Sequence, residues 1–132
     1  MTTPFWCLLI VVLIPYVLAG TTGFLKNRDL GSVDNDHPRD QSKQFAEGST
    51  GRRAVAAQEN AWEATAVFTA AVVVAHLAGA AEGTSAIAAM VFVVARIVHG
   101  FCYVSGIAML RSVSFLVGIV CCLTLFGLAI RA

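Results

Sequence analysis

Residues 113–130 read VSFLVGIVCCLTLFGLAI and contain no charged side chain. An α-helix needs about 20 apolar residues to cross the hydrocarbon core of a bilayer, and this stretch approaches that length. Residues 4–19, 61–79 and 85–105 form three further apolar stretches of similar size. None of them shows the period-2 alternation of a half-buried strand. The sequence therefore predicts an all-α, integral membrane four-helix bundle.

The composition excludes an ordinary water-soluble domain. Hydrophobic residues make up 58% of the chain and charged residues only 13%, whereas soluble domains carry about 25% charged residues. A length of 132 residues indicates one domain, residues 1–132. Basic and acidic residues nearly balance, so the net charge of +1 gives no indication of a nucleic-acid partner, and none is expected. The four cysteines lie in apolar stretches without metal-ligand spacing, and no metal site is predicted.

Basic residues are distributed unevenly between the links. The first link, residues 20–60, holds six of the nine basic residues, whereas the second, residues 79–84, holds none. The third link carries Arg111. Because short cytoplasmic loops are enriched in Lys and Arg, we expect the first and third links in the cytoplasm and both termini outside. As an alternative for the first stretch, Val17 and Ala19 fit a signal-peptidase site.

Ionisable side chains inside the expected helices are costly in a bilayer and therefore point to a function. Arg96, His99 and Tyr103 are spaced three and four residues apart, so they share one helical face. Asn60 and Glu63 also share a face, at a similar depth, on the preceding helix. His76 lies alone near the other end of that helix and is interpreted as structural or interfacial.

Arg111 and Ser112 begin the expected fourth helix at the same end of the bundle. Seven polar residues from three helices thus converge on one level: Asn60, Glu63, Arg96, His99, Tyr103, Arg111 and Ser112. Guanidinium groups match carboxylate geometry, so this cluster suits a small ligand with carboxylates. Two structural readings remain open: Glu63 neutralises Arg96 between packed helices, and Arg111 only anchors the helix at the membrane surface.

The order and spacing of these residues resemble a known family. RAVAAQENAWEA, residues 53–64, resembles the R-A-x-x-A-x-x-N-x-x-E-A signature of the MAPEG family, membrane-associated proteins in eicosanoid and glutathione metabolism. ARIVHGFCY, residues 95–103, and LRSVSF, residues 110–115, agree in order and spacing. The turn-rich DNDHPR, residues 34–39, is similar to the D-N-x-x-P-R of bacterial members.

The resemblance implies a four-helix subunit, assembled as a homotrimer, with glutathione bound between neighbouring subunits near the cytoplasmic face. By position, it implies glutathione contacts for Asn60, Glu63, Arg96, His99 and Tyr103. It implies activation of the glutathione thiol by Arg111 and Ser112. A bacterial inner membrane is the expected location.

Three positions depart from the family pattern. The eicosanoid enzymes of the family carry an arginine where this chain has Ala56. The prostaglandin E synthase branch carries another at Glu59, and a tyrosine at Phe115. Two cationic contacts to the tripeptide are therefore missing.

Two functional hypotheses follow from these observations. The first is a glutathione-dependent transferase or peroxidase that acts on lipophilic electrophiles arriving from the bilayer. In it, cations around the bound thiol favour the nucleophilic thiolate. The alternative is a non-catalytic membrane scaffold or partner-binding protein that retains the fold.

Overall fold

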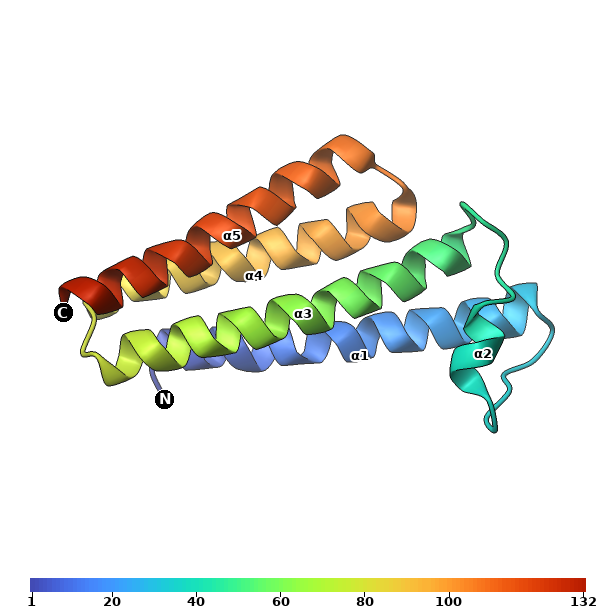
Figure 1. Ribbon diagram of the computed structural model, residues 1–132, viewed down its shortest axis with the longest axis horizontal. Coiled ribbons are helices and arrows are strands. Elements are labelled where there is room, and N and C mark those ends of the chain that lie inside the picture. Colours follow the sequence, from blue (N-terminus) through green and yellow to red (C-terminus); the bar gives the residue numbers. More distant parts are fainter.

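The computed structural model describes all 132 residues and is entirely helical. Four long helices lie along one axis, and a short helix lies in the segment between the first two of them (Figure 1). The five helices are α1 (Thr3–Asp29), α2 (Pro38–Ser42), α3 (Thr50–Leu77), α4 (Glu82–Ser105) and α5 (Ala108–Arg131).

The helices extend beyond the bounds expected from hydropathy. Residues 20–29 and 50–60, expected in the first link, belong to α1 and α3, and α5 begins at Ala108 instead of residue 113. Hydropathy marks where apolar residues end, whereas the backbone of α3 remains helical through the Ala, Arg, Gln and Glu of residues 50–60, which favour helix. The start of α3 is fixed by Ser49, whose hydroxyl accepts a hydrogen bond from the backbone N–H of Arg52 at 3.2 Å.

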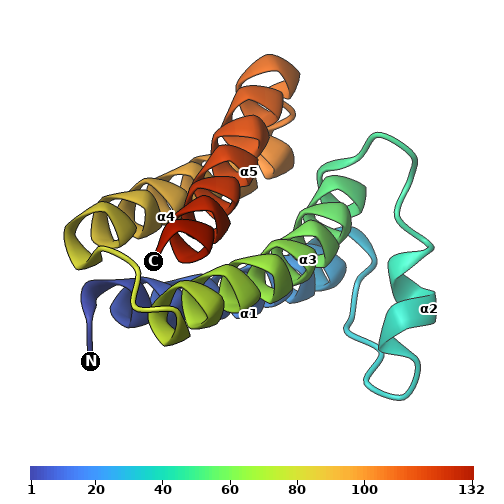
Figure 2. The same ribbon diagram turned by 60° about the vertical axis from the view of Figure 1, so that its left-hand side comes forward.

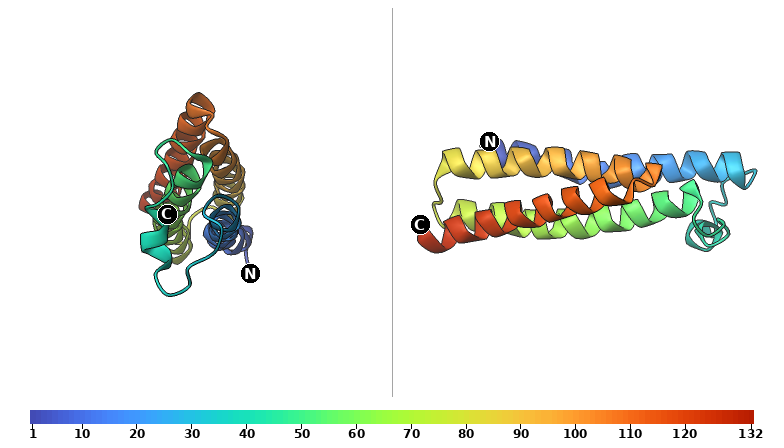
Figure 3. Two further views of the ribbon diagram at one scale, coloured as in Figure 1. Left: turned by 90° about the vertical axis from the view of Figure 1, so that its right-hand side faces the viewer. Right: turned by 90° about the horizontal axis from the view of Figure 1, so that it is seen from above.

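Each long helix has two long neighbours around the bundle. Helix α1 packs against α3 and α4, and α5 packs against the same two helices, with α3 and α4 also in contact across the centre (Figure 3). Both termini lie at the same end as the α3–α4 turn, and the residue 30–49 segment and the α4–α5 turn lie at the other end (Figure 1). This arrangement is that of a chain that crosses a membrane four times.

The surface of the bundle suits lipid. All four long helices are long and apolar enough to span a bilayer. Large apolar side chains point outward along them, among them Leu13, Val74, Val94 and Leu116. A continuous exposed apolar surface of this kind is unfavourable in water. The chain is therefore an integral multi-pass membrane protein with an all-α, four-helix bundle fold.

Two phenylalanines fill the centre of the bundle. Phe68 of α3 and Phe92 of α4 stack with ring centroids 4.0 Å apart and rings almost parallel. Small residues surround them, including Ala71 and Ala89, both fully buried. Small side chains allow helix backbones to approach closely, which is how helices pack in membranes.

The segment before α3 is anchored by the Phe45 side chain. Phe45 is buried in a small cluster with Leu25 of α1 and Ala54 of α3. Its ring lies directly over Gly51, where a Cβ atom would come within 2.2 Å of a ring carbon. Buried Lys26 of α1 also donates a hydrogen bond to the carbonyl of Pro38. These contacts hold the segment against the ends of α1 and α3.

The turn expected at residues 34–39 is present. The carboxylate of Asp34 accepts hydrogen bonds from the backbone N–H groups of Asp36 and His37, both at 2.9 Å. Such an Asx turn reverses the chain locally, and Pro38 then begins α2.

We expect Gly51→Ala to destabilise the protein, although replacing glycine by alanine in a helix interior normally stabilises it by about 0.5–1 kcal/mol. The added methyl overlaps the Phe45 ring, and overpacking of this kind costs about 1–3 kcal/mol. Thermal unfolding in detergent measures the effect. The matched control is Gly20→Ala, because its Cβ meets no atom within 4 Å. A Gly51→Ala variant as stable as Gly20→Ala would contradict the packing of Phe45.

Candidate functional site

A buried guanidinium links α4 to α3. Arg96 is only 3% exposed, and its Nη2 donates to the side-chain oxygen of Asn60 at 2.7 Å. The amide nitrogen of Asn60 in turn donates to Glu63 Oε2 at 3.4 Å. Arg96 and Asn60 therefore form the direct contact between the two polar helix faces.

The direct Glu63–Arg96 ion pair, weighed as a structural reading of the sequence, is not formed. No nitrogen of Arg96 lies within 4.0 Å of a Glu63 carboxylate oxygen. Asn60 faces α4, whereas Glu63 is rotated around α3 by its three-residue separation and is exposed. Its carboxylate accepts a hydrogen bond from Asn60 but has no ion-pair partner, so it can accept from a further group.

His99 forms the centre of a second group. Its ring is 3% exposed, and Nδ1 lies 3.0 Å from the backbone oxygen of Arg111. A carbonyl only accepts hydrogen bonds, so Nδ1 carries the proton. Nε2 is buried and has no hydrogen-bond partner. The ring also packs edge-on against Tyr103, with centroids 5.6 Å apart.

Arg111 stacks on the same tyrosine. Its guanidinium carbon lies 4.7 Å from the centroid of the Tyr103 ring, a cation–π contact. Because α5 begins at Ala108, the backbone N–H of Arg111 is already bonded to the carbonyl of Ile107 at 3.1 Å. The sequence predicted that α5 begins at Arg111, but the helix begins three residues earlier. The backbone N–H groups without helical partners therefore belong to the residues before Arg111.

Ser112 is the outlier among the predicted residues. It is exposed, and its hydroxyl donates to the Ala108 carbonyl one turn earlier on α5, at 3.1 Å. No hydrogen bond joins it to the other six predicted residues. The side chain that does bond within the site is Ser114, which is buried and donates to the Arg111 carbonyl at 2.9 Å.

A cavity of about 200 Å³ opens beside Arg96 between α3, α4 and α5. Of the predicted residues it is lined by Asn60, Glu63 and Arg96. Its α5 wall, which was not predicted from the sequence, includes Phe115, Gly118 and Cys122. These three share one helical face with Arg111 at spacings of four, three and four residues, a signal that could have found them.

The structure therefore divides the predicted site into two adjoining groups. His99, Tyr103 and Arg111 do not line the cavity. The ring of Phe115 connects the groups, because it lines the cavity and lies 5.9 Å from the His99 ring. A molecule in the cavity would contact Asn60, Glu63 and Arg96 directly. The Phe115 ring would separate it from His99, Tyr103 and Arg111.

Arg53, the first residue of the motif, holds the end of α4. Its guanidinium donates to the carbonyl of Val104 at 3.0 Å, to the carbonyl of Gly48 at 2.6 Å and to the hydroxyl of Thr50 at 3.1 Å. The Val104 carbonyl is in the last turn of α4, where helical partners are lacking. Arg53 is thus a structural cation that fastens α4 to the start of α3.

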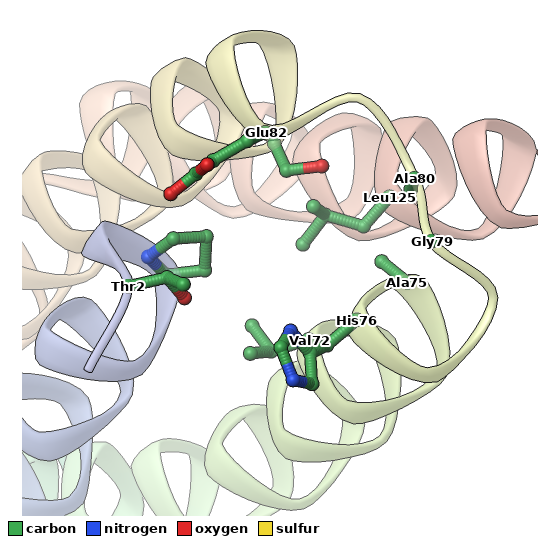
Figure 4. A pocket seen from close by; sticks show the side chains of 10 residues that line it. Thr2, Val72, Ala75, His76, Gly79, Ala80, Glu82 and Leu125 are labelled. Atoms are coloured by element: carbon green, nitrogen blue, oxygen red, sulfur yellow. The ribbon is translucent and has the colours of Figure 1, made fainter.

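A second cavity, of about 230 Å³, lies at the opposite end of the bundle. His76 of α3 and Glu82 of α4 reach it from different sides, near Thr2 (Figure 4). The His76 ring packs edge-on against Phe5 with centroids 5.0 Å apart, in keeping with an interfacial role. Ser85 also lines this cavity, and its buried hydroxyl has no hydrogen-bond partner.

One comparison with known proteins bears on the fold. The model of the MAPEG family matches residues 3–131. The match covers almost the whole chain, so the protein belongs to the MAPEG family. No curated protein and no solved structure matches the chain. Membership of this family fits a membrane protein related to glutathione and eicosanoid metabolism.

We expect Asn60→Ala to lower the free energy of unfolding more than Glu63→Gln does. Removing the Asn60 amide leaves the buried Arg96 guanidinium without its side-chain acceptor, at a cost of about 1–3 kcal/mol. Glu63→Gln keeps an acceptor for Asn60 on an exposed side chain, so its effect stays within about 0.5 kcal/mol. Thermal unfolding of both variants in one detergent compares them. Equal losses would show that Asn60 is not the partner that stabilises Arg96.

Proposed function

We propose that this protein is a glutathione-dependent transferase or peroxidase that acts on lipophilic electrophiles from the bilayer. The observation that carries the proposal is the cavity beside Arg96. A buried guanidinium, a carboxylate without an ion-pair partner and an amide face it within the hydrocarbon-spanning part of a MAPEG chain. A charge in that environment requires a partner.

The cavity offers complementary groups for the charged ends of a tripeptide. The Arg96 guanidinium suits a carboxylate. The Glu63 carboxylate, which has no ion-pair partner in the chain, suits an ammonium group. Asn60 bonds both residues and so fixes their positions relative to each other.

We assign activation of the thiol to Arg111, with Ser112 beside it. Because neither residue lines the cavity, this requires the thiol arm of the tripeptide to extend past Phe115 toward Arg111. The half-buried Arg111 guanidinium lies in the first turns of α5, where the positive end of the helix dipole adds to its charge. A cation lowers the pKa of a nearby thiol because it stabilises the thiolate. The thiolate then attacks an electrophilic carbon, forms the C–S bond, and displaces the leaving group. Ser112 takes part only if its hydroxyl leaves the Ala108 carbonyl.

The alternative is a non-catalytic scaffold or partner-binding protein. It is favoured by the exposed Ser112 hydroxyl, which is already bonded to the Ala108 carbonyl. It is also favoured by Ala56, where the family's eicosanoid enzymes carry an arginine, and by Glu59, where the prostaglandin E synthase branch carries one. In this reading the Asn60–Arg96 bond serves only to join α3 and α4. A direct test of thiol activation separates the two functions.

We further propose that the protein is a homotrimer in a bacterial inner membrane, with both termini outside the cytoplasm. The basic residues of segment 30–49 and of the helix ends beside it lie at the end opposite the termini. The positive-inside rule assigns that end to the cytoplasm. A trimer would place neighbouring helices against the open sides of the cavity.

We expect glutathione mixed with the protein at neutral pH to give the ultraviolet absorbance of a thiolate. In Arg111→Ala the ratio of thiolate to thiol should fall about tenfold, which corresponds to a loss of roughly 1.4 kcal/mol of thiolate stabilisation. Arg131→Ala is the matched control, because it removes a cation from the exposed far end of the same helix. Native mass spectrometry checks that each variant remains a trimer. Absence of a thiolate signal in the parent protein at saturating glutathione would reject the transferase mechanism.

Topology is tested separately with a reporter fused after Ala132. We expect activity from a reporter that works only outside the cytoplasm, such as a periplasmic phosphatase, because the basic segment lies at the opposite end of the bundle. A second fusion within the segment at residues 30–49 serves as the control and should be inactive. Activity of a cytoplasm-only reporter after Ala132 would reverse the orientation.

A further inference from the structure

The cavity at the end of the bundle with the termini is separate from the site beside Arg96. It lies where the start of α1, the end of α3 and the start of α4 meet (Figure 2). None of its lining residues lines the cavity beside Arg96. Its volume of about 230 Å³ is below the roughly 300–1,000 Å³ of sites for drug-sized molecules, so it suits a small ligand. We call it the α3–α4 turn cavity.

A buried hydroxyl without a partner faces this cavity. Ser85 is 5% exposed, lines the cavity, and its Oγ makes no hydrogen bond. Hydroxyls inside helices can donate to the carbonyl one turn earlier, as those of Ser112 and Thr124 do. Ser85 does not, and the Ala81 carbonyl accepts only its backbone N–H, at 3.1 Å. Because buried polar groups are normally paired, this hydroxyl indicates a partner from outside the chain.

The charge of the cavity favours a cation. Glu82 is the only acidic residue that lines it, and no lysine or arginine does. The Glu82 carboxylate has no ion-pair partner within 4.0 Å. The positive end of the α4 dipole is offset by the negative end of α3, which ends at Leu77 beside the same turn. The charge that remains at the cavity is that of Glu82.

Two hydrogen-bond acceptors stand on one face of α4. Glu82 and Ser85 are three residues apart, so their side chains lie on the same side of the helix. The carboxylate is at the exposed rim and the hydroxyl is buried. An ammonium group has three N–H donors and no acceptor, so one such group matches both. The lining is otherwise mostly apolar and includes the buried side chains of Val72, Ala75 and Leu125.

We propose that the α3–α4 turn cavity binds the primary ammonium group of a small amphiphilic amine. The ammonium donates to the Glu82 carboxylate and to Ser85 Oγ, and a short alkyl chain lies against the apolar wall. His76 reaches the cavity from the opposite side (Figure 4), where its neutral ring offers an acceptor nitrogen to a second donor. Two sources carry this chemistry, a free amine and the ethanolamine headgroup of a phospholipid. The binding is independent of the thiol chemistry.

Ligand-observed NMR of the full-length protein in mild detergent tests the proposal, with n-butylammonium, n-butanol and butyrate as probes and detergent alone as the blank. We expect butylammonium to bind at least about tenfold more tightly than butanol, and butyrate not to bind, because charge-assisted hydrogen bonds are the strong ones. Glu82→Gln should weaken butylammonium binding about fivefold. Glu47→Gln is the matched control, because Glu47 is an exposed carboxylate in the segment at the other end of the bundle.

Ser85→Ala gives a second readout that a purely structural hydroxyl would not give. It should weaken butylammonium binding roughly threefold and also raise the unfolding temperature of the ligand-free protein, because it removes a buried hydroxyl that has no partner. A lower unfolding temperature would show that the hydroxyl is already bonded in the free protein, and would overturn its assignment to a ligand.

Native mass spectrometry distinguishes the two sources of the ammonium group. Retention of phosphatidylethanolamine over phosphatidylcholine that is lost in Glu82→Gln assigns the cavity to a lipid headgroup, because the trimethylated headgroup has no N–H to donate. Equal retention of the two lipids, with butylammonium bound, assigns it to a free amine.

Three outcomes would overturn the proposal as a whole. They are tighter binding of butyrate than of butylammonium, equal affinity of Glu82→Gln and Glu47→Gln for butylammonium, and displacement of butylammonium by saturating glutathione. The first would assign the cavity to an anion at the start of α4. The last would place the amine beside Arg96. Failure of the thiolate test changes none of these results.

Discussion

The hydrogen bond between Arg96 and Asn60 is the interaction on which the rest of the bundle depends. A guanidinium buried at 3% exposure within membrane-spanning helices is stable only if a protein acceptor replaces water. Asn60 provides that acceptor at 2.7 Å, which sets the register of α3 against α4. The stacked Phe68 and Phe92 rings lie on the same two helices, so the polar contact and the apolar core select one alignment.

This alignment also decides which groups face the cavity. With Asn60 used by Arg96, the Glu63 carboxylate has no cation in contact and stays available to a ligand. On α5, Gly118 leaves the space that the cavity occupies: a Cβ there would lie 3.5 Å from Phe92 and 3.7 Å from Arg96. A structural contact and an opening for a ligand are thus built from the same few side chains.

The two ends of the bundle differ in how the chain is held. At one end, Arg53 bonds the last turn of α4 to the start of α3, and Phe45 packs on Gly51. These contacts hold the segment that carries α2 against the start of α3. At the other end, the α3–α4 turn is short, and the buried Ser85 hydroxyl has no partner. Most of the fixed polar contacts therefore gather at the end with the basic residues.

The sequence by itself determined the four membrane helices, because hydrocarbon length and hydropathy act locally along the chain. It also determined the family, because the motif blocks keep their order and spacing. Only the tertiary structure decided that Asn60, and not Glu63, bonds Arg96, since helix rotation depends on packing between helices. For the same reason the sequence did not predict that Gly118 and Cys122 line the cavity. It also did not predict that Arg53 bonds the end of α4 to the start of α3. The ends of α1, α3 and α5 that lie in polar segments were not predicted either. Hydropathy indicates which residues lie in the hydrocarbon, but it does not indicate where the backbone stops being helical.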